Sequence, residues 1–404
     1  RGGGDEELAD VPQAIQLYGA LLERDPAHAE TMDALESIID ARDERDMAFG
    51  VLRPVLVASE SWERLWVQYE VLAAHSEDNP ELLLERLHEM ADLAEGELQD
   101  PERAYAALDR AFRSDSRHAE TTQKIEALAK REGVLESLVE LYHEIAEDAD
   151  DDLALSLRLR TGAFLMEDLR DAERAIEVYQ RIRTDEPDHP EALARLARLY
   201  RGESMADELA EALRNQIDTQ HDPAEKVELL SELARLKETE LEDKSGAHEV
   251  FTEILDLDRG NRGAIDALHR LASEGVHTLD IAERLESVYS EEEAWDALQS
   301  LLQIKLNVVE DEGDRLELSR QLADIFLHRL SDQASALTWF GHALRLDPDD
   351  NFLVEELTRL STEISGWSAL RPILMDAAEV ADEARKVELW SQAGDINRVH
   401  LQDV

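Results

Sequence analysis

Apolar residues recur at helical spacing along almost the whole chain. Between Ala14 and Leu22 they fall three and four positions apart, which places them on one face of an α-helix. Strict alternation of apolar and polar residues, which would indicate β-strands, is scarce. The pattern therefore predicts an all-α protein.

A short motif, Leu-x-Asp-x-x-x-Ala, repeats along the sequence. Its aspartates, called anchors below, are Asp10, Asp100, Asp171, Asp243 and Asp332, and a sixth copy begins with Leu401 and Asp403. Successive anchors lie about 70 or about 90 residues apart, and self-similarity at a fixed period is typical of a solenoid. We expect the anchors at equivalent turns between paired helices.

Two further positions keep their character relative to each anchor. The residue nine places before it is small, as in Ala91, Gly162, Ala234, Ala323 and Gly394. A large apolar side chain follows the motif's alanine by four places, as in Tyr18, Leu108, Tyr179, Phe251 and Phe340. A small side chain allows two helices to approach closely, so each anchor is expected to join the two helices of a hairpin.

These residues resemble the tetratricopeptide repeat (TPR), which has a small residue in its first helix, Ala and an aromatic residue in its second, and Pro at the following turn. The spacing from Gly162 to Ala175 is one residue longer than usual in that family, which predicts a slightly longer turn. Ser116 and Arg259 stand where Pro is expected. The resemblance implies a right-handed superhelical solenoid of TPR-like helical hairpins, similar to segments of the very long TPR proteins of some delta-proteobacteria.

The anchor spacing predicts one solenoid over residues 1–404, taken as a fragment of a longer repeat array. Its double repeats are placed at roughly 10–99, 100–170, 171–242, 243–331 and 332–402. The two longer intervals are expected to hold one additional helix each, near 47–59 and 278–290.

Charge and composition narrow the classes of partner. Hydrophobic residues make up 43% and charged residues 34% of the chain, which suits a folded protein with a soluble surface. The net charge of −52 argues against binding to nucleic acid or to anionic membranes and favours a basic partner. No apolar run is long enough to span a membrane. The compartment stays open, with a cytoplasmic location favoured.

The sequence predicts no catalytic residue, cofactor or metal site. Cysteine is absent, which removes disulfides, thiolate ligands and thiol catalysis. There is no phosphate-binding loop, no nucleophile elbow and no His-Glu-x-x-His zinc motif. Three histidines, His28, His118 and His189, occupy one equivalent turn position and are interpreted as structural. The chain is therefore expected not to be an enzyme.

Three tryptophans, Trp62, Trp295 and Trp367, share one phase of the repeat, which predicts burial between neighbouring hairpins. The repeat pattern constrains the environment of Trp66 and Trp390 less, and contact with a partner is left open for both.

The resemblance also implies a binding surface, because first helices line the concave groove of TPR folds. Carried over from the small-residue position, the candidate partner-binding residues are Asp92, Glu95, Met166, Arg235, Glu238, Asp324, Leu327, Asp395 and Arg398. This predicts a protein-interaction scaffold that binds a basic, partly apolar protein or peptide. Rival hypotheses are an acidic chaperone for basic proteins, an accessory region of an enzyme with its catalytic domain elsewhere, and a purely structural spacer. Self-association stays open.

Overall fold

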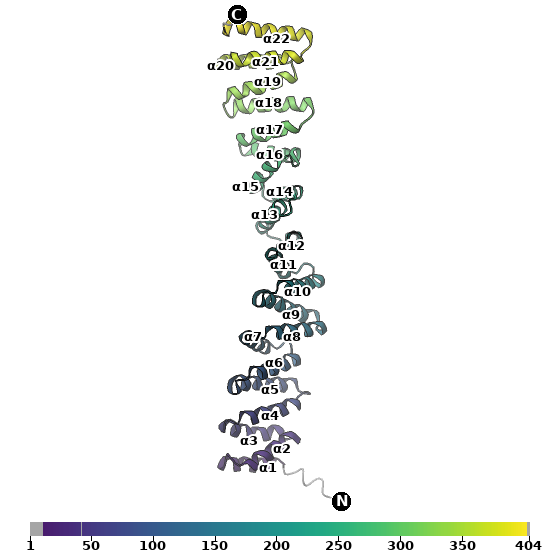
Figure 1. Ribbon diagram of the computed structural model, residues 1–404, viewed down its shortest axis with the longest axis vertical. Coiled ribbons are helices and arrows are strands. Elements are labelled where there is room, and N and C mark those ends of the chain that lie inside the picture. Colours follow the sequence, from purple (N-terminus) through teal and green to yellow (C-terminus); the bar gives the residue numbers. More distant parts are fainter. Residues whose placement is uncertain (1–10, 42, 402–404) are drawn as a thin grey trace. The chain divides into compact units, whose positions relative to one another are not determined.

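All regular structure in the described part of the chain is helical. The computed structural model describes residues 11–41 and 43–401, and within these ranges it contains 22 α-helices, three short π-helical segments and no strand (Figure 1). The all-α prediction is therefore confirmed. Contacts divide the chain into two units, Arg1–Ala192 and Leu193–Val404, and the division falls inside α11 (Pro190–Gly202).

The helices of unit 1 before this division are α1 (Val11–Arg24), α2 (Ala29–Ala41), α3 (Arg45–Ala58), α4 (Trp62–Ala74), α5 (Pro80–Leu93), η1 (Ala94–Leu98), α6 (Pro101–Ser114), α7 (Ala119–Glu132), α8 (Leu135–Asp148), α9 (Asp151–Ala163), η2 (Phe164–Leu169) and α10 (Ala172–Asp185). Those of unit 2 after it are α12 (Ala206–Thr219), α13 (Pro223–Thr239), α14 (Lys244–Leu257), α15 (Arg262–Ser273), α16 (Thr278–Glu291), α17 (Trp295–Val308), α18 (Glu312–His328), α19 (Gln333–Leu346), α20 (Asn351–Ile364), α21 (Trp367–Val380), α22 (Glu383–Ile396) and η3 (Asn397–Leu401).

Helices in unit 1 form two rows, because each helix contacts the next one and also the one after that. Ion pairs join α3 to α5, α5 to α7 and α7 to α9 through Arg53–Glu89, Lys124–Asp92 and Arg160–Glu126. A second series joins α2, α4, α6, α8 and α10 in order through Arg64–Asp33, Arg110–Glu70, Arg113–Glu144 and Arg174–Glu136. We call them the odd row and the even row of unit 1.

Unit 2 has two rows of the same kind. In the first, called the α13 row, Arg270 joins α15 to Glu238 on α13, and His269 joins α15 to Ser300 on α17. The second, called the α18 row, contains α14, α16, α18, α20 and α22. Arg284–Asp256 joins α16 to α14, Arg320–Asp350 joins α18 to α20, and two shared cavities described below join α16 to α18 and α20 to α22.

The four described anchors occupy equivalent turn positions, as predicted. Each is the N-cap of the helix that follows, α6, α10, α14 or α19. The carboxylates of Asp100, Asp171, Asp243 and Asp332 accept a hydrogen bond from the backbone amide three residues later, at 3.0, 3.1, 2.8 and 3.0 Å. This bond satisfies an amide that the first turn of a helix leaves unpaired. Asp10 and Asp403 lie outside the described residues.

The turn before each anchor explains the longer spacing. The residue just before the anchor is left-handed, with φ of 51° at Gln99, 56° at Arg170, 52° at Glu242 and 58° at Ser331. The anchor amide donates to the carbonyl six residues earlier, as from Asp171 to Leu165 at 2.8 Å. In two hairpins this wide turn closes through the π-helical segments η1 and η2, and a π-helical turn holds one residue more than an α-helical turn. The predicted longer turn is confirmed.

The small position marks the closest approach of two helices. A Cβ atom on Gly162 would lie 2.6 Å from Cζ of Tyr179, so only glycine fits beneath this ring without rearrangement. Ala91, Ala234 and Ala323 are buried at the equivalent position. Gly394 is exposed, and a Cβ atom built on it would meet no atom within 4 Å.

The helices that carry the small residue, called first helices, do not all share a row in unit 2. Helices α3 and α16 occupy the two segments for which the sequence predicts an additional helix. Because α16 adds a single helix to the alternating stack, the first helix before it, α13, lies in the α13 row, whereas α18 and α22 lie in the α18 row. The arrangement of both units as one continuous right-handed array stays a prediction.

Candidate functional site

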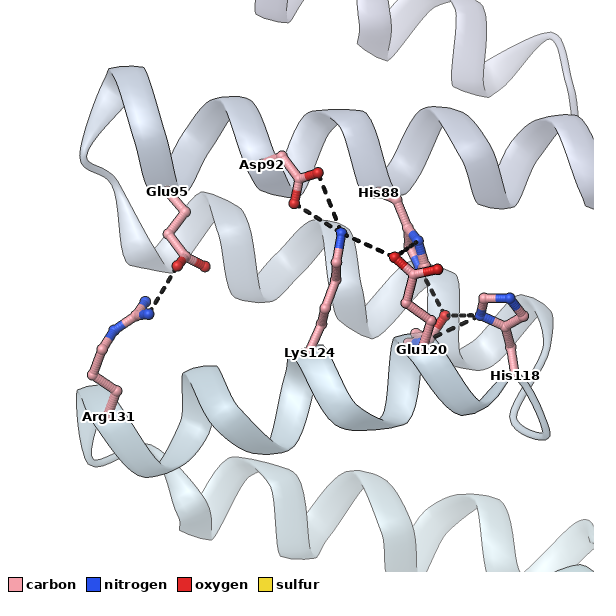
Figure 2. Close-up of polar contacts among 8 residues, drawn as sticks. His88, Asp92, Glu95, His118, Glu120, Lys124 and Arg131 are labelled. Carbon is pink, nitrogen blue, oxygen red and sulfur yellow. Dashed lines mark hydrogen bonds and ion pairs between the residues drawn. The ribbon is translucent and has the colours of Figure 1, made fainter.

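Three of the predicted residues lie in the odd row of unit 1. Asp92 is on α5, Glu95 on η1 and Met166 on η2. Figure 2 shows that both acids face cations on α7: Nζ of Lys124 lies 2.9 and 3.2 Å from the carboxylate oxygens of Asp92, and Nη1 of Arg131 lies 2.8 Å from Glu95. These acids already have partners within the protein. The surface formed by α5, η1 and α7 therefore carries paired charges instead of being uniformly negative.

A polar cluster beside them couples the same two helices. Nε2 of His88 on α5 lies 2.7 Å from the Thr121 hydroxyl on α7, and Nδ1 of His118 lies 2.9 Å from the same hydroxyl (Figure 2). Burial, aided by the charge of Lys124, lowers the pKa of the His88 imidazole, so the neutral ring is favoured at neutral pH. Hydrogen bonding between helices is therefore the role that this cluster supports.

The histidines that share one turn position act as helix caps. In each of His28, His118 and His189, Nδ1 accepts a hydrogen bond from the backbone amide three residues later, at 3.2, 3.3 and 3.3 Å. Their interpretation as structural residues is confirmed. The described residues bring together no group of three His, Asp or Glu side chains that could hold a metal ion.

Two predicted residues lie on α13 in unit 2. The i to i+3 spacing of Arg235 and Glu238 suggests an ion pair between them, but Glu238 instead accepts a hydrogen bond at 2.9 Å from Nη2 of Arg270 on α15. The neighbouring helix reaches Glu238 across the row, and the exposed Arg235 forms no ion pair with any residue that the structure describes. That pairing was therefore wrong.

The other four predicted residues lie in the α18 row. Arg398 lies 2.8 Å from Asp395, the i to i+3 pair that the spacing predicts. Asp324 forms an ion pair with His328 at 4.0 Å, and Leu327 packs on the buried core formed by the last helices. Within unit 2 the predicted residues therefore divide between two rows, and partner binding at any of the nine stays a prediction.

A cavity of about 640 Å³ opens between α16, α17 and α18, and we call it the Trp295 cavity. Its lining comprises Glu286, Ser290, Trp295, Leu298, Leu302, Gln321, Asp324, Ile325, His328 and Arg329. The guanidinium of Arg329 lies over the indole of Trp295, 4.6 Å from the ring centroid. The predicted residue Asp324 therefore lines a cavity that combines apolar side chains with polar and charged ones.

A second cavity of about 640 Å³, the Trp367 cavity, opens between α20, α21 and α22. The imidazole of His400 stacks on the indole of Trp367 at 3.7 Å, as Arg329 covers Trp295. Five lining positions correspond between the two cavities: Trp295 and Trp367, Leu302 and Leu374, Gln321 and Gln392, Asp324 and Asp395, and Ile325 and Ile396. One repeat unit therefore reproduces the lining of the other.

Sequence reasoning missed these cavities, although a signal was present. The segments Gln321-Leu-Ala-Asp-Ile325 and Gln392-Ala-Gly-Asp-Ile396 share their first, fourth and fifth residues. Trp62, Trp295 and Trp367 are all only partly buried, less than predicted. Trp295 and Trp367 line the two cavities. Trp66 is also partly buried, and Trp390 is 46% exposed.

A third cavity, of about 730 Å³, lies between α14 and α16 and is more polar. Asp256, Asp280, Glu283 and two arginines line it, and Arg284 is paired with Asp256 across it. The rings of His248 and His277 stack at 4.6 Å near this cavity. Within the lining Arg284 neutralises Asp256, whereas Arg259 pairs with Glu291 outside it.

No family model matches the sequence, and no curated protein matches it. Similar solved structures include Naa15/Naa10 bound to HypK-THB, with 16% identity over 95% of this chain and a TM-score of 0.33; this chain spans 62% of that one. YrrB, described as a TPR protein with an unusual peptide-binding site, shows 13% identity over 50% of this chain and 91% of its own, with a TM-score of 0.24. A TPR protein from Parabacteroides merdae ATCC 43184 shows 14% identity over 69% of this chain and 98% of its own, with a TM-score of 0.28.

No helix among the described residues is both long enough and apolar enough to cross a membrane. Anchor caps, a buried small residue in the first helix and paired rows of helices recur in the hairpins of both units. The described part of each unit is therefore an all-α array of TPR-like helical hairpins.

Proposed function

We propose that the chain is a non-enzymatic scaffold that binds a basic, partly apolar segment of a partner protein. The observation that carries this proposal is the distribution of charge. Lys124, Arg131 and Arg270 already contact acids of neighbouring helices. Because 94 acidic residues face only 42 basic ones, a large acidic surplus remains even if every cation neutralises one acid. A partner rich in Lys and Arg would complement that surplus and be steered toward it.

Peptide selection on the full chain tests this proposal. A display library of random peptides is selected at 0.15 M salt, and the enriched peptides are compared with scrambled peptides of the same composition by fluorescence anisotropy. We expect enriched peptides that combine Lys or Arg with apolar residues and bind about tenfold tighter than their scrambled forms, a difference of about 1.4 kcal/mol. Failure to enrich any class of sequence would contradict the proposal.

The net charge of −52 also favours a second candidate, an acidic chaperone for basic proteins. Such a chaperone would bind selected and scrambled peptides equally, because only total charge matters to it. Its binding would also be lost at 1 M salt, where electrostatic interactions extend only ~3 Å. A scaffold that uses apolar contacts would retain part of its affinity at that salt concentration.

A further inference from the structure

We propose that the Trp295 and Trp367 cavities form a two-point site that holds a single basic segment by two of its apolar side chains. This inference rests on the proposed scaffold function and specifies where and how the partner binds. Its basis is the repetition of one lining, described above, at two places in the same row of helices.

The inner part of each cavity suits an apolar side chain. In the Trp295 cavity, Leu298, Leu302 and Ile325 are buried, and the partly buried indole of Trp295 adds an aromatic wall. Leu374 and Ile396 are the buried counterparts in the Trp367 cavity. An apolar side chain that covers such buried aliphatic and aromatic groups can act as an anchor and supply much of the binding energy.

The opening of each cavity suits a cation beside the anchor. Asp324 is exposed, and its ion-pair partner among the described residues is His328, at 4.0 Å. Arg329 lines the same cavity, but its guanidinium lies over the indole of Trp295. Asp395 is paired with Arg398, but both side chains are exposed, at 62% and 78%. An exposed ion pair of this kind contributes little to the free energy of unfolding. A partner cation can therefore contact Asp324 directly and compete with Arg398 for Asp395. This charge complementarity selects a basic occupant.

The spacing of the cavities sets the length of the occupant. Corresponding lining residues lie on α18 and α22, with α20 between them in the row, and packed helices lie about 8 to 10 Å apart. Two such steps place the cavities about 16 to 20 Å apart, which an extended segment of five or six residues spans. Occupying both cavities with one segment makes the second contact intramolecular, and such linkage can raise affinity by about 10²-fold or more.

The equivalent positions in unit 1 carry larger side chains. Tyr69 and Tyr142, both buried, stand where Leu302 and Leu374 stand in unit 2. Arg53 lies over Tyr69, 6.0 Å from the ring centroid, and occupies the position equivalent to Glu286. A tyrosine ring fills space that leucine leaves open, so the paired lining is a feature of unit 2.

The test blocks each cavity without removing core atoms. Ser290 and Thr362 are exposed residues of α16 and α20 that line the two cavities, and each hydroxyl is bonded to the carbonyl four residues earlier. Ser290→Trp and Thr362→Trp place an indole at the cavity rim. The probe is the highest-affinity peptide selected on the parent protein, and its Kd is measured by fluorescence anisotropy on the full chain.

Matched controls place the same indole elsewhere in unit 2. Ser273 on α15 and Thr338 on α19 are exposed residues whose hydroxyls bond to a preceding carbonyl of their own helix, and neither lines a cavity named above. We expect Ser290→Trp and Thr362→Trp each to weaken binding by about tenfold or more, because either one removes the second point of attachment. Ser273→Trp and Thr338→Trp should leave the Kd unchanged.

Two outcomes overturn the inference and differ in what they say about function. If peptides are selected but bind both rim variants as tightly as the parent, the two-point site is wrong while the scaffold function stands. If the parent selects no peptide, both are wrong. Circular dichroism and thermal unfolding of the rim variants, compared with the control variants, show that the loss of binding is not a loss of fold.

Discussion

At the scale of the residue, local chemistry decides how each hairpin closes. The anchors and small positions were predictable from the sequence because their effect is local: a carboxylate caps the next helix, and a missing side chain admits a ring. The partial burial of Trp295 and Trp367 was not predictable in this way. It depends on α16, α18, α20 and α22 leaving space beside the two indoles, and the phase of a repeat carries no information on that space.

The cap at Asp332 gives a prediction about pH. Hydrogen bonds from the Ser335 hydroxyl, at 2.6 Å, and from the Ser335 amide lower the pKa of Asp332. The stabilisation is present above the carboxyl's ordinary pKa of about 3.9 and is lost as pH falls through the lower pKa of the folded state. Asp332→Ala should cost about 1 kcal/mol at pH 7.

Asp332→Asn separates the charge from the hydrogen bond. Asn keeps a cap acceptor but cannot ionise, so we expect a smaller loss than with Ala at pH 7 and a difference from the parent that shrinks below about pH 4. Urea midpoints measured between pH 3 and pH 7 check this. A difference that grows as pH falls would mean that the charged carboxylate does not stabilise the turn.

The contact between Gly162 and Tyr179 gives a second prediction at this scale. Gly162→Ala places a Cβ atom 2.6 Å from Cζ of Tyr179, so the ring or α9 must shift, at a cost of about 1 to 3 kcal/mol. Hydrogen exchange should show the loss in α9 and α10. In the control Gly96→Ala, no atom lies within 4 Å of the new Cβ, and equal losses in both variants would refute the packing explanation.

At the scale of the element, the insertion of a single helix decides which surfaces can act together. The sequence indicates an additional helix near 278–290, and α16 occupies that segment. Its consequence for the site was not anticipated: Arg235 and Asp324 hold equivalent positions in the repeat, one residue after the small position, but lie in different rows of unit 2. Motif phase identifies equivalent residues, whereas the number of intervening helices decides which row they occupy.

Contacts between neighbouring helices of one row also decide which acids stay available to a partner, and α5 and α7 provide a test. Asp92→Lys places a second cation beside Lys124, and Lys124→Asp places a second acid beside Asp92. Each single reversal should therefore lower stability through repulsion of like charges, and the double reversal should restore it. The pair is exposed, so the coupling energy should be only about 0.2 to 1 kcal/mol. Chemical denaturation of the four proteins at 0.05 M salt measures it. Additive effects in the double variant would show that the pair is not coupled.

At the scale of the whole molecule, net charge opposes the folded state. With 94 acidic against 42 basic side chains, mutual repulsion should destabilise the protein at low ionic strength. Added salt shortens the range of this repulsion from ~30 Å at 0.01 M to ~3 Å at 1 M. We expect the thermal midpoint to rise across that interval. A midpoint independent of salt would indicate that the acidic surplus serves partner binding alone.

The central claim is that a basic segment binds along the α18 row, and hydrogen-exchange mass spectrometry tests it most directly. The full chain is labelled with and without a saturating concentration of the selected peptide. The account predicts slower exchange in α16–α18 and in α20–α22, with little change in α13 and α15. Protection confined to unit 1, or to the α13 row, would contradict it.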